Sequence, residues 1–349
     1  MNDYAADRLA NWTASDLDDT AQWIHRLSDA ETADLDRALR TTKARHGSCA
    51  TMVKEDFPLD AMRPTLARLL DRLENGRGVY VLRGIPTERY SKEDLRLMYW
   101  GIGLNMGRAV SQSRRGDLLG DVKNFNSDFN SAKGRGYVSR QHLGFHTDTS
   151  DVVGLFVIQT AMRGGVSMFC SSLAVHDEIK RTRPDLLEVL YQPFHWSWKG
   201  QEEPGELPYY TMPVYSSAGG RFSSRFIRSH IRAAQEFPDV PRLTAKQEEA
   251  INLVFDMAND RRFCREMKFE SGDVQFLNNH VTMHARTEFE DFPEPERKRH
   301  LLRLWLAVPN SRPLDDGMKA IFRDTRAGAF RGGFPSRVSE HTYETVNPD

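Results

Sequence analysis

The second half of the chain contains a succession of short segments typical of β-strands, and this succession constrains the fold most strongly. The segments are VVGLFVI (152–158), GGVSMFCSS (164–172), a hairpin over 208–227 that turns at Gly219-Gly220, MKFESGDVQFLNN (267–279) and HLLRLWLAV (300–308). Helical patterns separate them, among them PDLLEVL (184–190) and a helix that begins after Thr244. We therefore predict an α+β protein with a mainly β core, a barrel or a double sheet, covered by helices.

The N-terminal part, about residues 1–110, is predicted to be mainly helical. Ser28 and Glu31 form the pattern of a capping box, and Pro64 precedes leucines at helical spacing. The segment VYVLRG (79–84) has the pattern of a short buried strand, and a further helix is expected to begin at Ser91.

Residues 111–141 differ in character, because they are rich in serine, asparagine, glycine and charge and show little periodicity. A loop of this length inside a compact domain is uncommon, and where one occurs it is often a lid or a binding loop. We interpret the segment as lid-like, and a disordered insertion is the alternative.

Charge and cysteine content exclude several classes of protein. The 48 basic and 49 acidic residues nearly cancel, which argues against a dedicated nucleic-acid binder. Three scattered cysteines form no CxxC motif and fit a reducing compartment. The first residues do not resemble a signal peptide, and no apolar run is long enough to span a bilayer. These features predict a cytoplasmic protein and are compatible with work on small molecules.

The most informative motif is His146-x-Asp148, which stands directly before the apolar segment 152–158. By chance about 1.5 histidines should have an acidic residue two positions later, and the sequence contains two such pairs, so the motif alone carries no information. The position of the motif, directly before an apolar segment, is more informative. An ionised aspartate beside a core needs a partner, because burying an unpaired carboxylate is costly. A metal ion would be such a partner, and a surface coincidence is the alternative.

Two histidines and one carboxylate commonly hold a ferrous ion on one triangular face. The segment 276–291 offers His280 and His284 as further ligands, four residues apart. A zinc-peptidase H-E-x-x-H motif is excluded, since Val281 stands where the glutamate is required. His142 and His146 are also four residues apart, but Gly144 and the following strand argue against a shared helix. We interpret the i, i+4 spacing of both pairs as accidental.

Four segments together resemble the taurine dioxygenase branch of the iron(II)- and 2-oxoglutarate-dependent oxygenases, which includes clavaminate-synthase-like enzymes. They are GFHTDTS, RGGVSMFCSS, LNNHVTMHART and RKRHLLRLWL, and they occur in the family's order between Leu143 and Val308. The resemblance implies a double-stranded β-helix, the cupin-like jelly roll, with surrounding helices. It also implies one oxygenase domain over 1–349, with its helical part at about 1–110, a lid-like loop at about 111–141 and a jelly-roll core at about 142–310.

The same resemblance implies roles for particular residues. His146, Asp148 and His284 would be the catalytic iron ligands, and His280 would have a supporting or merely structural role. Arg303, nineteen residues after His284, would bind the distal carboxylate of 2-oxoglutarate, because a guanidinium binds a carboxylate through two parallel hydrogen bonds. Arg299 is the alternate for this role, and Ser167 would hydrogen-bond the cosubstrate where the family usually has threonine.

The implied reaction uses Fe(II), 2-oxoglutarate and O2, releases succinate and CO2, and most often hydroxylates a small molecule. A halogenase is disfavoured, since those family members have a small residue in place of the aspartate. A macromolecular substrate and a non-catalytic cupin-like sensor remain alternatives, and a homodimer is the default assembly. Substrate contacts are expected in the loop before the His-x-Asp motif, where a plain loop role is the alternative, at Asn124, Asn126, Gln141 and His142.

Overall fold

A computed structural model describes residues 4–125, 140–337 and 340–345. Its helices are α1 (Asp29–Ala44), α2 (Arg63–Asn75), α3 (Lys92–Met106), α4 (Ser172–Thr182), α5 (Pro184–Leu190), α6 (Arg228–Ala234), α7 (Ala245–Asn259) and α8 (Lys319–Phe322). Its longer strands are β2 (Val79–Arg83), β4 (Leu119–Val122), β5 (Leu143–His146), β6 (Val152–Gln159), β8 (Ser167–Ser171), β9 (Phe194–Ser197), β10 (Tyr209–Met212), β11 (Tyr215–Ala218), β12 (Arg221–Ser224), β14 (Val274–Asn278), β15 (Thr282–Arg286) and β17 (His300–Ala307). Shorter strands are β1 (Ile24–Arg26), β3 (Arg108–Ala109), β7 (Arg163–Gly164), β13 (Arg265–Met267) and β16 (Phe289–Glu290).

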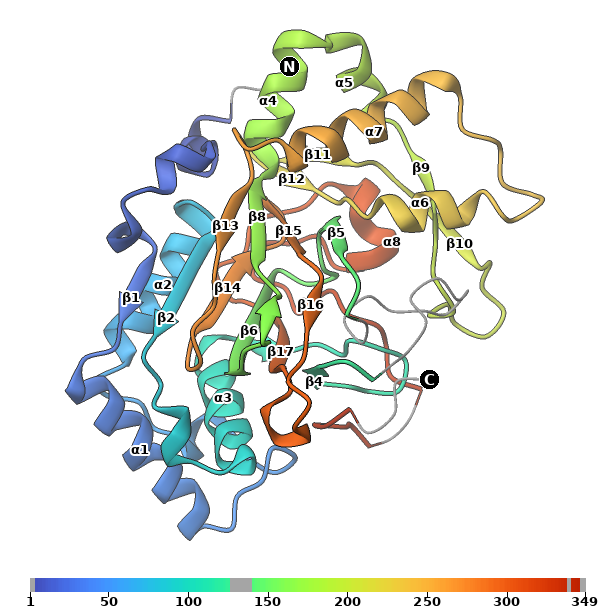
Figure 1. The fold of residues 1–349 in the computed structure, drawn as a ribbon. Helices are drawn as coiled ribbons and strands as arrows, with labels where there is room; N and C mark the ends of the chain where they lie inside the picture. Colours follow the sequence, from blue (N-terminus) through green and yellow to red (C-terminus); the bar gives the residue numbers. More distant parts are fainter. Residues whose placement is uncertain (1–3, 126–139, 338–339, 346–349) are drawn as a thin grey trace.

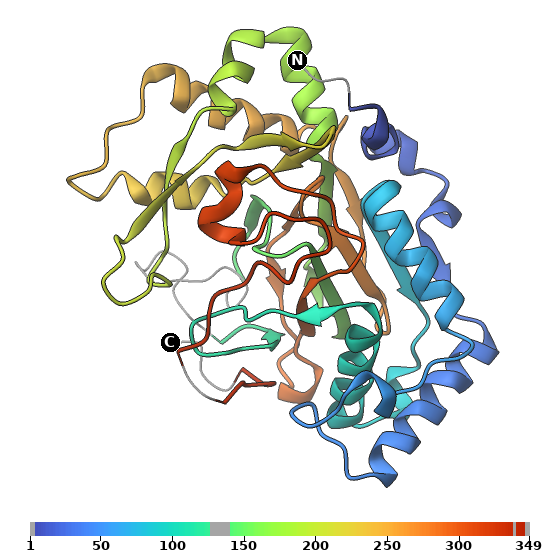
Figure 2. The same ribbon diagram turned by 180° about the vertical axis from the view of Figure 1, so that it is seen from behind.

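Two sheets form the core. The larger has the order β1-β2-β14-β6-β17-β3, with β4 also paired to β17, and the smaller has the order β13-β8-β15-β5. Helices α1–α3 and helices α4–α7 gather on different sides of these strands, and the segment after β17 crosses the back of the molecule (Figures 1 and 2). The predicted mixture of strands and covering helices is confirmed, and β2 brings the helical N-terminal part into the larger sheet.

Side-chain alternation along the strands divides the core into layers. On β17, Leu301 and Trp305 belong to the apolar cluster that also contains Phe169 of the smaller sheet, so they face the space between the sheets. Leu302 and Leu304 point the other way and pack with residues of α1–α3. Arg303 shares the parity of Leu301 and Trp305. This arginine is therefore directed into the space between the sheets.

Several predicted boundaries are confirmed, because local chemistry sets them. Ser28 and Glu31 form the capping box of α1, and Ser91 accepts a hydrogen bond at the start of α3. Thr244 and Gln247 form the box of α7, and β11 and β12 pair as a hairpin around the two glycines.

The segment that the sequence suggested to be a lid is in part a strand of the core. Residues 119–122 form β4, all four are buried, and they pair with β17. Gln112 is also buried and donates to the backbone oxygen of Arg303 at 2.9 Å. Residues 119–122 therefore belong to the larger sheet rather than to a lid. Residues 126–139, which include Asn126, lie outside the described part.

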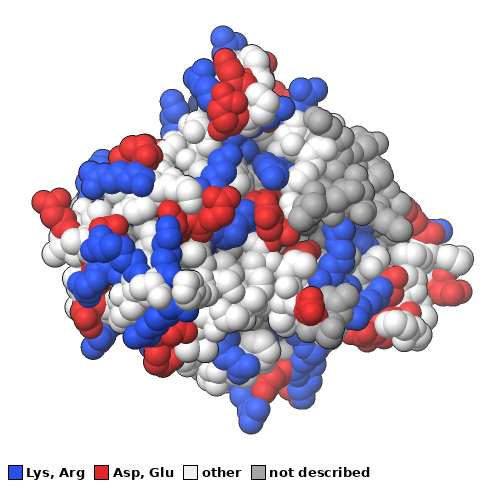
Figure 3. Space-filling view, turned by 90° about the horizontal axis from the view of Figure 1, so that it is seen from below, with Lys and Arg blue, Asp and Glu red and all other residues white. Residues whose placement is uncertain are grey.

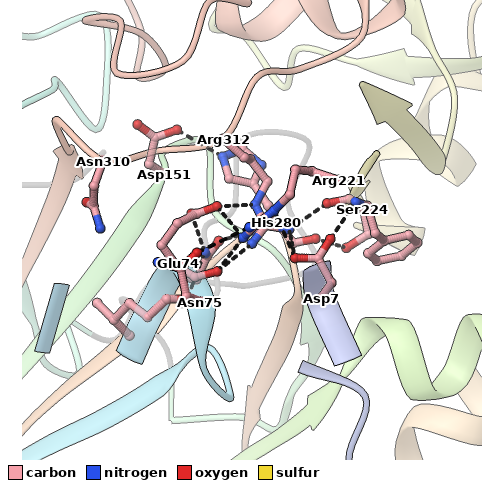
Figure 4. Close-up of polar contacts among 12 residues, drawn as sticks. Asp7, Glu74, Asn75, Asp151, Arg221, Ser224, His280, Asn310 and Arg312 are labelled. Atoms are coloured by element: carbon pink, nitrogen blue, oxygen red, sulfur yellow. Dashed lines mark hydrogen bonds and ion pairs between the residues drawn. The ribbon is translucent and has the colours of Figure 1, made fainter. Parts of the chain in front are cut away.

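A buried ionic cluster joins distant segments behind the smaller sheet (Figure 4). Asp7 and Glu74 each contact Arg221 and Arg312, with N···O separations between 2.8 and 3.3 Å. Two acids and two guanidiniums balance in charge, so removing one partner would leave an uncompensated buried charge. This cluster fixes the N-terminal segment and α2 against β12 and the segment after β17.

The outer surface gives no sign of a nucleic-acid site on the face in Figure 3, where basic and acidic side chains are interspersed. Among the described residues, every helix is too short or too polar to cross a membrane.

Candidate metal centre and active site

The strand pairing of the smaller sheet brings three potential metal ligands together. His146 ends β5, and His284 stands directly opposite it on the antiparallel strand β15. Asp148 follows two residues after His146, where the chain leaves β5. A nitrogen or oxygen of each side chain lies within 4.8 Å of the other two, and this is the one such cluster in the described parts of the chain.

The ligand atoms face one another. Asp148 Oδ1 is 3.8 Å from His146 Nε2, and Asp148 Oδ2 is 3.6 Å from His284 Nε2. The two imidazole rings have centroids 4.2 Å apart. His146 Nδ1 is 3.0 Å from the backbone oxygen of Gly144, to which it can donate, and this leaves the lone pair of Nε2 for a metal.

Protonation states also suit a metal. Burial, together with the neighbouring His146, lowers the pKa of His284 to about 3. Burial likewise lowers the pKa of His146, against the opposing effect of Asp148. Burial raises the pKa of Asp148, but Arg303 and the two histidines outweigh it, so the pKa lies below its usual range. Neutral imidazoles beside a carboxylate are the forms that bind a cation.

One unpartnered atom tests the fit of a metal. Asp148 Oδ2 is buried and makes no hydrogen bond within the described structure. A buried carboxylate oxygen without a partner is costly, and a ferrous ion between two imidazoles would satisfy it. The donor set of two nitrogens and one oxygen is that of non-haem iron sites. The residues present therefore fit Fe(II).

Asn279 holds the aspartate in place. Its side-chain oxygen accepts from the backbone N–H of Asp148 at 2.9 Å, and its amide nitrogen donates to Ser150 at 3.1 Å. Sequence reasoning missed this role, although Asn279 stands in the LNNH segment that led to His284.

The two candidate arginines occupy different positions. Arg303 Nη1 is 3.9 Å from Asp148 Oδ1, and its Nε donates to Gln112 at 2.7 Å. Arg303 lines both the large cavity beside Asp148 and a small cavity that both histidine ligands also line, whereas Arg299 lines the small cavity alone. Ser167 and Arg286 line this small cavity as well.

Arg299 is buried and forms no salt bridge among the described residues, and Asp291 is the acidic residue that acts on it from a distance. It is 4% exposed, and its Nη1 has no hydrogen-bond partner among the described residues. Its guanidinium lies 4.9 Å from the ring centroid of Phe289. Burial, together with Arg286, lowers the pKa of Arg299 to about 9. A buried guanidinium without a counter-ion indicates a place for an anion.

A second, larger cavity of about 550 Å³ opens on the other side of the ligands. Of the four predicted substrate residues, His142 lines it, whereas Gln141 and Asn124 are not among its lining residues and Asn126 is not described. Trp198 lines the cavity, but Trp196 is buried in the apolar core. Basic residues that the sequence did not single out also line it, namely Lys199, Arg225, Arg228 and Arg232.

His280 lies outside the ligand cluster. Its Nε2 is 2.9 Å from Asp151 Oδ1, and Arg331 donates to the same carboxylate oxygen at 2.7 Å. The expected supporting or structural place of His280 agrees with these contacts.

Comparisons with known proteins agree with this geometry. The model of the family described as "Taurine catabolism dioxygenase TauD, TfdA family" matches residues 40–305. FR-33289 synthase of Streptomyces rubellomurinus is 27% identical over 330 residues, which cover 90% of this chain and 96% of the relative. A taurine hydroxylase-like protein, SAT17, of Stachybotrys chartarum is 28% identical over 306 residues, 84% of this chain and 77% of the relative.

Solved structures of non-haem iron oxygenases share the fold. An asparagine oxygenase in complex with Fe(II), hydroxyasparagine and succinate superposes with a TM-score of 0.62 at 15% identity, over 81% of this chain and 93% of the other. The oxygenase OrfP in complex with Fe and alpha-ketoglutaric acid superposes with a TM-score of 0.60 at 16% identity, with the same coverage.

Proposed function

This chain belongs to the TauD, TfdA family of dioxygenases, and from that premise we propose how its own residues serve the reaction. The predicted enzyme class is confirmed, an iron(II)- and 2-oxoglutarate-dependent dioxygenase that acts on a small molecule, with O2 as the oxidant. When bound, the iron supplies activation of O2 at a site that keeps three positions open. Neither a macromolecular substrate nor a non-catalytic sensor is favoured.

His146, Asp148 and His284 are the proposed iron ligands. The observation that carries this proposal is the convergence of the three side chains within 4.8 Å across paired strands, with Asp148 Oδ2 left unpartnered. Gly144 and Asn279 orient His146 and Asp148, and such contacts to metal ligands commonly change metal affinity by about 10- to 100-fold.

We assign the distal carboxylate of 2-oxoglutarate to Arg299, the alternate of the sequence prediction, rather than to Arg303. Both arginines line the small cavity with Ser167, but Nη1 of Arg299 is unpartnered among the described residues, whereas Arg303 donates to Gln112 and lies 3.9 Å from the ligand Asp148. Arg303 would then face the end of the cosubstrate nearer the metal. Its bond to Gln112 fixes the direction of this guanidinium.

Ser167 can take part through Gln275. Its hydroxyl donates to Gln275 Oε1 at 2.9 Å, and Gln275 Nε2 is buried without a partner among the described residues. Rotation of this amide by half a turn would let Nε2 donate to Ser167 and free the hydroxyl to donate to a carboxylate.

The two core sheets and the site between them support the finer fold prediction of a double-stranded β-helix. A cytoplasmic location and a homodimer stay predictions of the sequence.

Anaerobic addition of Fe(II) and 2-oxoglutarate tests the assignment. A weak visible charge-transfer band should appear with the wild-type protein and be absent from His146→Ala, because the chelate needs the imidazole. His46→Ala, at an exposed histidine, is the control and should keep the band. Absence of the band from the wild-type protein, together with no binding of 2-oxoglutarate, would refute the assignment.

A further inference from the structure

The segment that follows β12 runs alongside the loop that carries two of the proposed iron ligands. Thr147 donates its backbone N–H to the backbone oxygen of Phe226 at 2.9 Å, and the backbone N–H of Phe226 donates to Thr147 Oγ1 at 3.2 Å. An isolated antiparallel bridge joins His146 to Ile227. Residues 225–227 therefore cover the edge of β5 opposite to the one that β15 occupies.

Arg225 spans the ligand Asp148 from this segment. It is 2% exposed, and its Nη1 donates to the backbone oxygen of Thr147 at 2.7 Å while its Nη2 donates to Thr149 Oγ1 at 2.9 Å. One guanidinium thus holds the residue before the ligand and the residue after it. The planar fork of arginine suits this bridge, because its terminal nitrogens reach two acceptors in one fixed geometry.

The same strand also contacts the turn that precedes the third ligand. Ser224 donates to the backbone oxygen of His280 through its backbone N–H at 2.9 Å and through its hydroxyl at 3.1 Å (Figure 4). His280 follows Asn279, whose side chain accepts from the backbone N–H of Asp148. The consecutive residues Ser224 and Arg225 therefore contact both chain segments that set the direction of Asp148.

The other end of β12 is fixed by the buried ionic cluster described above (Figure 4). Asp7 Oδ2 accepts from the backbone N–H of Phe222 at 2.7 Å, and Asp7 Oδ1 is 3.0 Å from Arg221 Nε. An extended chain from Arg221 to Arg225 spans about 13 Å, at about 3.3 Å per residue. This strand is thus a short link, held by ion pairs at its start and bonded to the ligand loop at its end.

We propose that Arg225 is a positioning residue for the iron site, which holds Thr147 and Thr149 so that Asp148 presents its carboxylate to the metal. This deepens the proposed function and depends on Asp148 being a ligand. Arg225 lines the cavity beside Asp148, and a cation there repels Fe(II). Electrostatics alone therefore predicts that loss of this arginine tightens Fe(II) binding, whereas loss of the positioning contacts predicts that it weakens binding. The two effects have opposite signs.

Anaerobic titration of the protein with Fe(II) against a competing chelator tests the proposal. Arg225→Gln should bind Fe(II) about 10- to 100-fold more weakly than the wild type. Arg225→Lys keeps the charge but cannot bridge two acceptors, so it should also weaken binding. In both iron-saturated variants the charge-transfer band with 2-oxoglutarate should shift in wavelength, because the direction of the carboxylate ligand changes. The affinity for 2-oxoglutarate should stay near that of the wild type, since its proposed anchor is Arg299.

Arg228→Gln is the matched control. It removes a charge from the same cavity, but the guanidinium of Arg228 contacts Asn252 and Phe255 of α7 rather than the ligand loop. Its Fe(II) affinity should equal or slightly exceed that of the wild type. If Arg225→Gln does not fold, Thr149→Val replaces it, because this variant removes one acceptor at constant charge and should weaken Fe(II) binding at least about threefold.

Unchanged or tighter Fe(II) binding in Arg225→Gln, or an equal loss in Arg228→Gln, would overturn the proposal, as would unchanged binding in Thr149→Val. The charge-transfer band of the wild-type protein separates the two levels. A wild type that shows the band beside an Arg225→Gln variant with wild-type iron affinity refutes only the positioning role, whereas a wild type without the band refutes the proposed function.

Discussion

Replacing Arg299 with methionine should stabilise the free protein and abolish cosubstrate binding. The charged guanidinium is buried and forms no salt bridge within the described part of the chain, and burial, only partly offset by Asp291, lowers its pKa from 12.5 to about 9. Because the folded-state pKa is lowered, the charged form destabilises the fold at every pH below about 9. The gap of about 3.5 pKa units corresponds to about 5 kcal/mol at 1.36 kcal/mol per unit.

Methionine fills similar apolar space but loses the contact of the guanidinium with Phe289. We therefore expect the free energy of unfolding, measured with urea in the absence of iron and 2-oxoglutarate, to rise by about 2 to 4 kcal/mol. In the iron-loaded protein the substitution removes two charge-assisted hydrogen bonds of about 1.5 to 3 kcal/mol each, so the affinity for 2-oxoglutarate should fall about 10²- to 10⁴-fold.

Isothermal titration with 2-oxoglutarate under anaerobic conditions measures the second effect, and Arg303→Lys serves as the comparison. Since Arg303 lies beside Asp148, its substitution should weaken iron and 2-oxoglutarate binding together. If Arg299→Met is less stable than the wild type and keeps its 2-oxoglutarate affinity, the reasoning is wrong. In that case a loss of affinity confined to 2-oxoglutarate in Arg303→Lys would identify Arg303 as the anchor.

Three further predictions follow from single contacts. Asn279→Ala should lower Fe(II) affinity about 10-fold or more by freeing Asp148, as measured by anaerobic ferrous titration, and unchanged affinity would contradict the positioning role. Burial lowers the pKa of His280 to about 4, so the unfolded chain binds more protons between about pH 4 and 6.5. The fold should therefore lose up to about 3 kcal/mol as the pH falls through that window, and His280→Gln should flatten this slope in urea titrations at several pH values. Gly165→Ala places a methyl group 3.1 Å from Arg299 Nε at a φ of +65°. It should raise the KM for 2-oxoglutarate and lower stability by about 1 kcal/mol, and a wild-type KM would argue against the small cavity as the cosubstrate site.

The sequence predicted features whose cause is local. The capping boxes of α1 and α7 and the glycine turn between β11 and β12 depend on neighbouring residues, and the structure has them where expected. The ligand residues were found through order and spacing, but their proximity depends on the register that sets His284 opposite His146.

Other features depend on pairings that spacing does not encode. Residues 119–122 read as loop, because β4 is short and contains Gly120 and Asp121. Its place in the sheet comes from β17, and Asp121 is satisfied by Arg96 and His300. The choice between Arg299 and Arg303 also needed the structure, since Arg303 lies beside Asp148 and lines both cavities, whereas Arg299 lines the small cavity alone.

The basic residues that line the large cavity could not be predicted from the sequence for the same reason. One of these residues, Lys199, lies on a loop. Arg225 follows the hairpin of β11 and β12, and Arg228 begins α6, so no periodicity of the sequence links the three. Only the approach of β12 to the loop around Thr147 brings them to one cavity.

The hydrogen bond from Arg331 to Asp151 has a consequence for the order in which the metal site can form during synthesis of the chain. Arg331 donates to Asp151, three residues after the ligand Asp148, and the same carboxylate holds His280 in the strand turn before His284. During synthesis the ribosome releases both histidine ligands long before Arg331 emerges. A nascent chain that ends between His284 and Arg331 therefore contains all three proposed ligands, but it lacks the arginine that donates to Asp151. We therefore expect the metal site to reach its described geometry only after the segment that contains Arg331 has been synthesised.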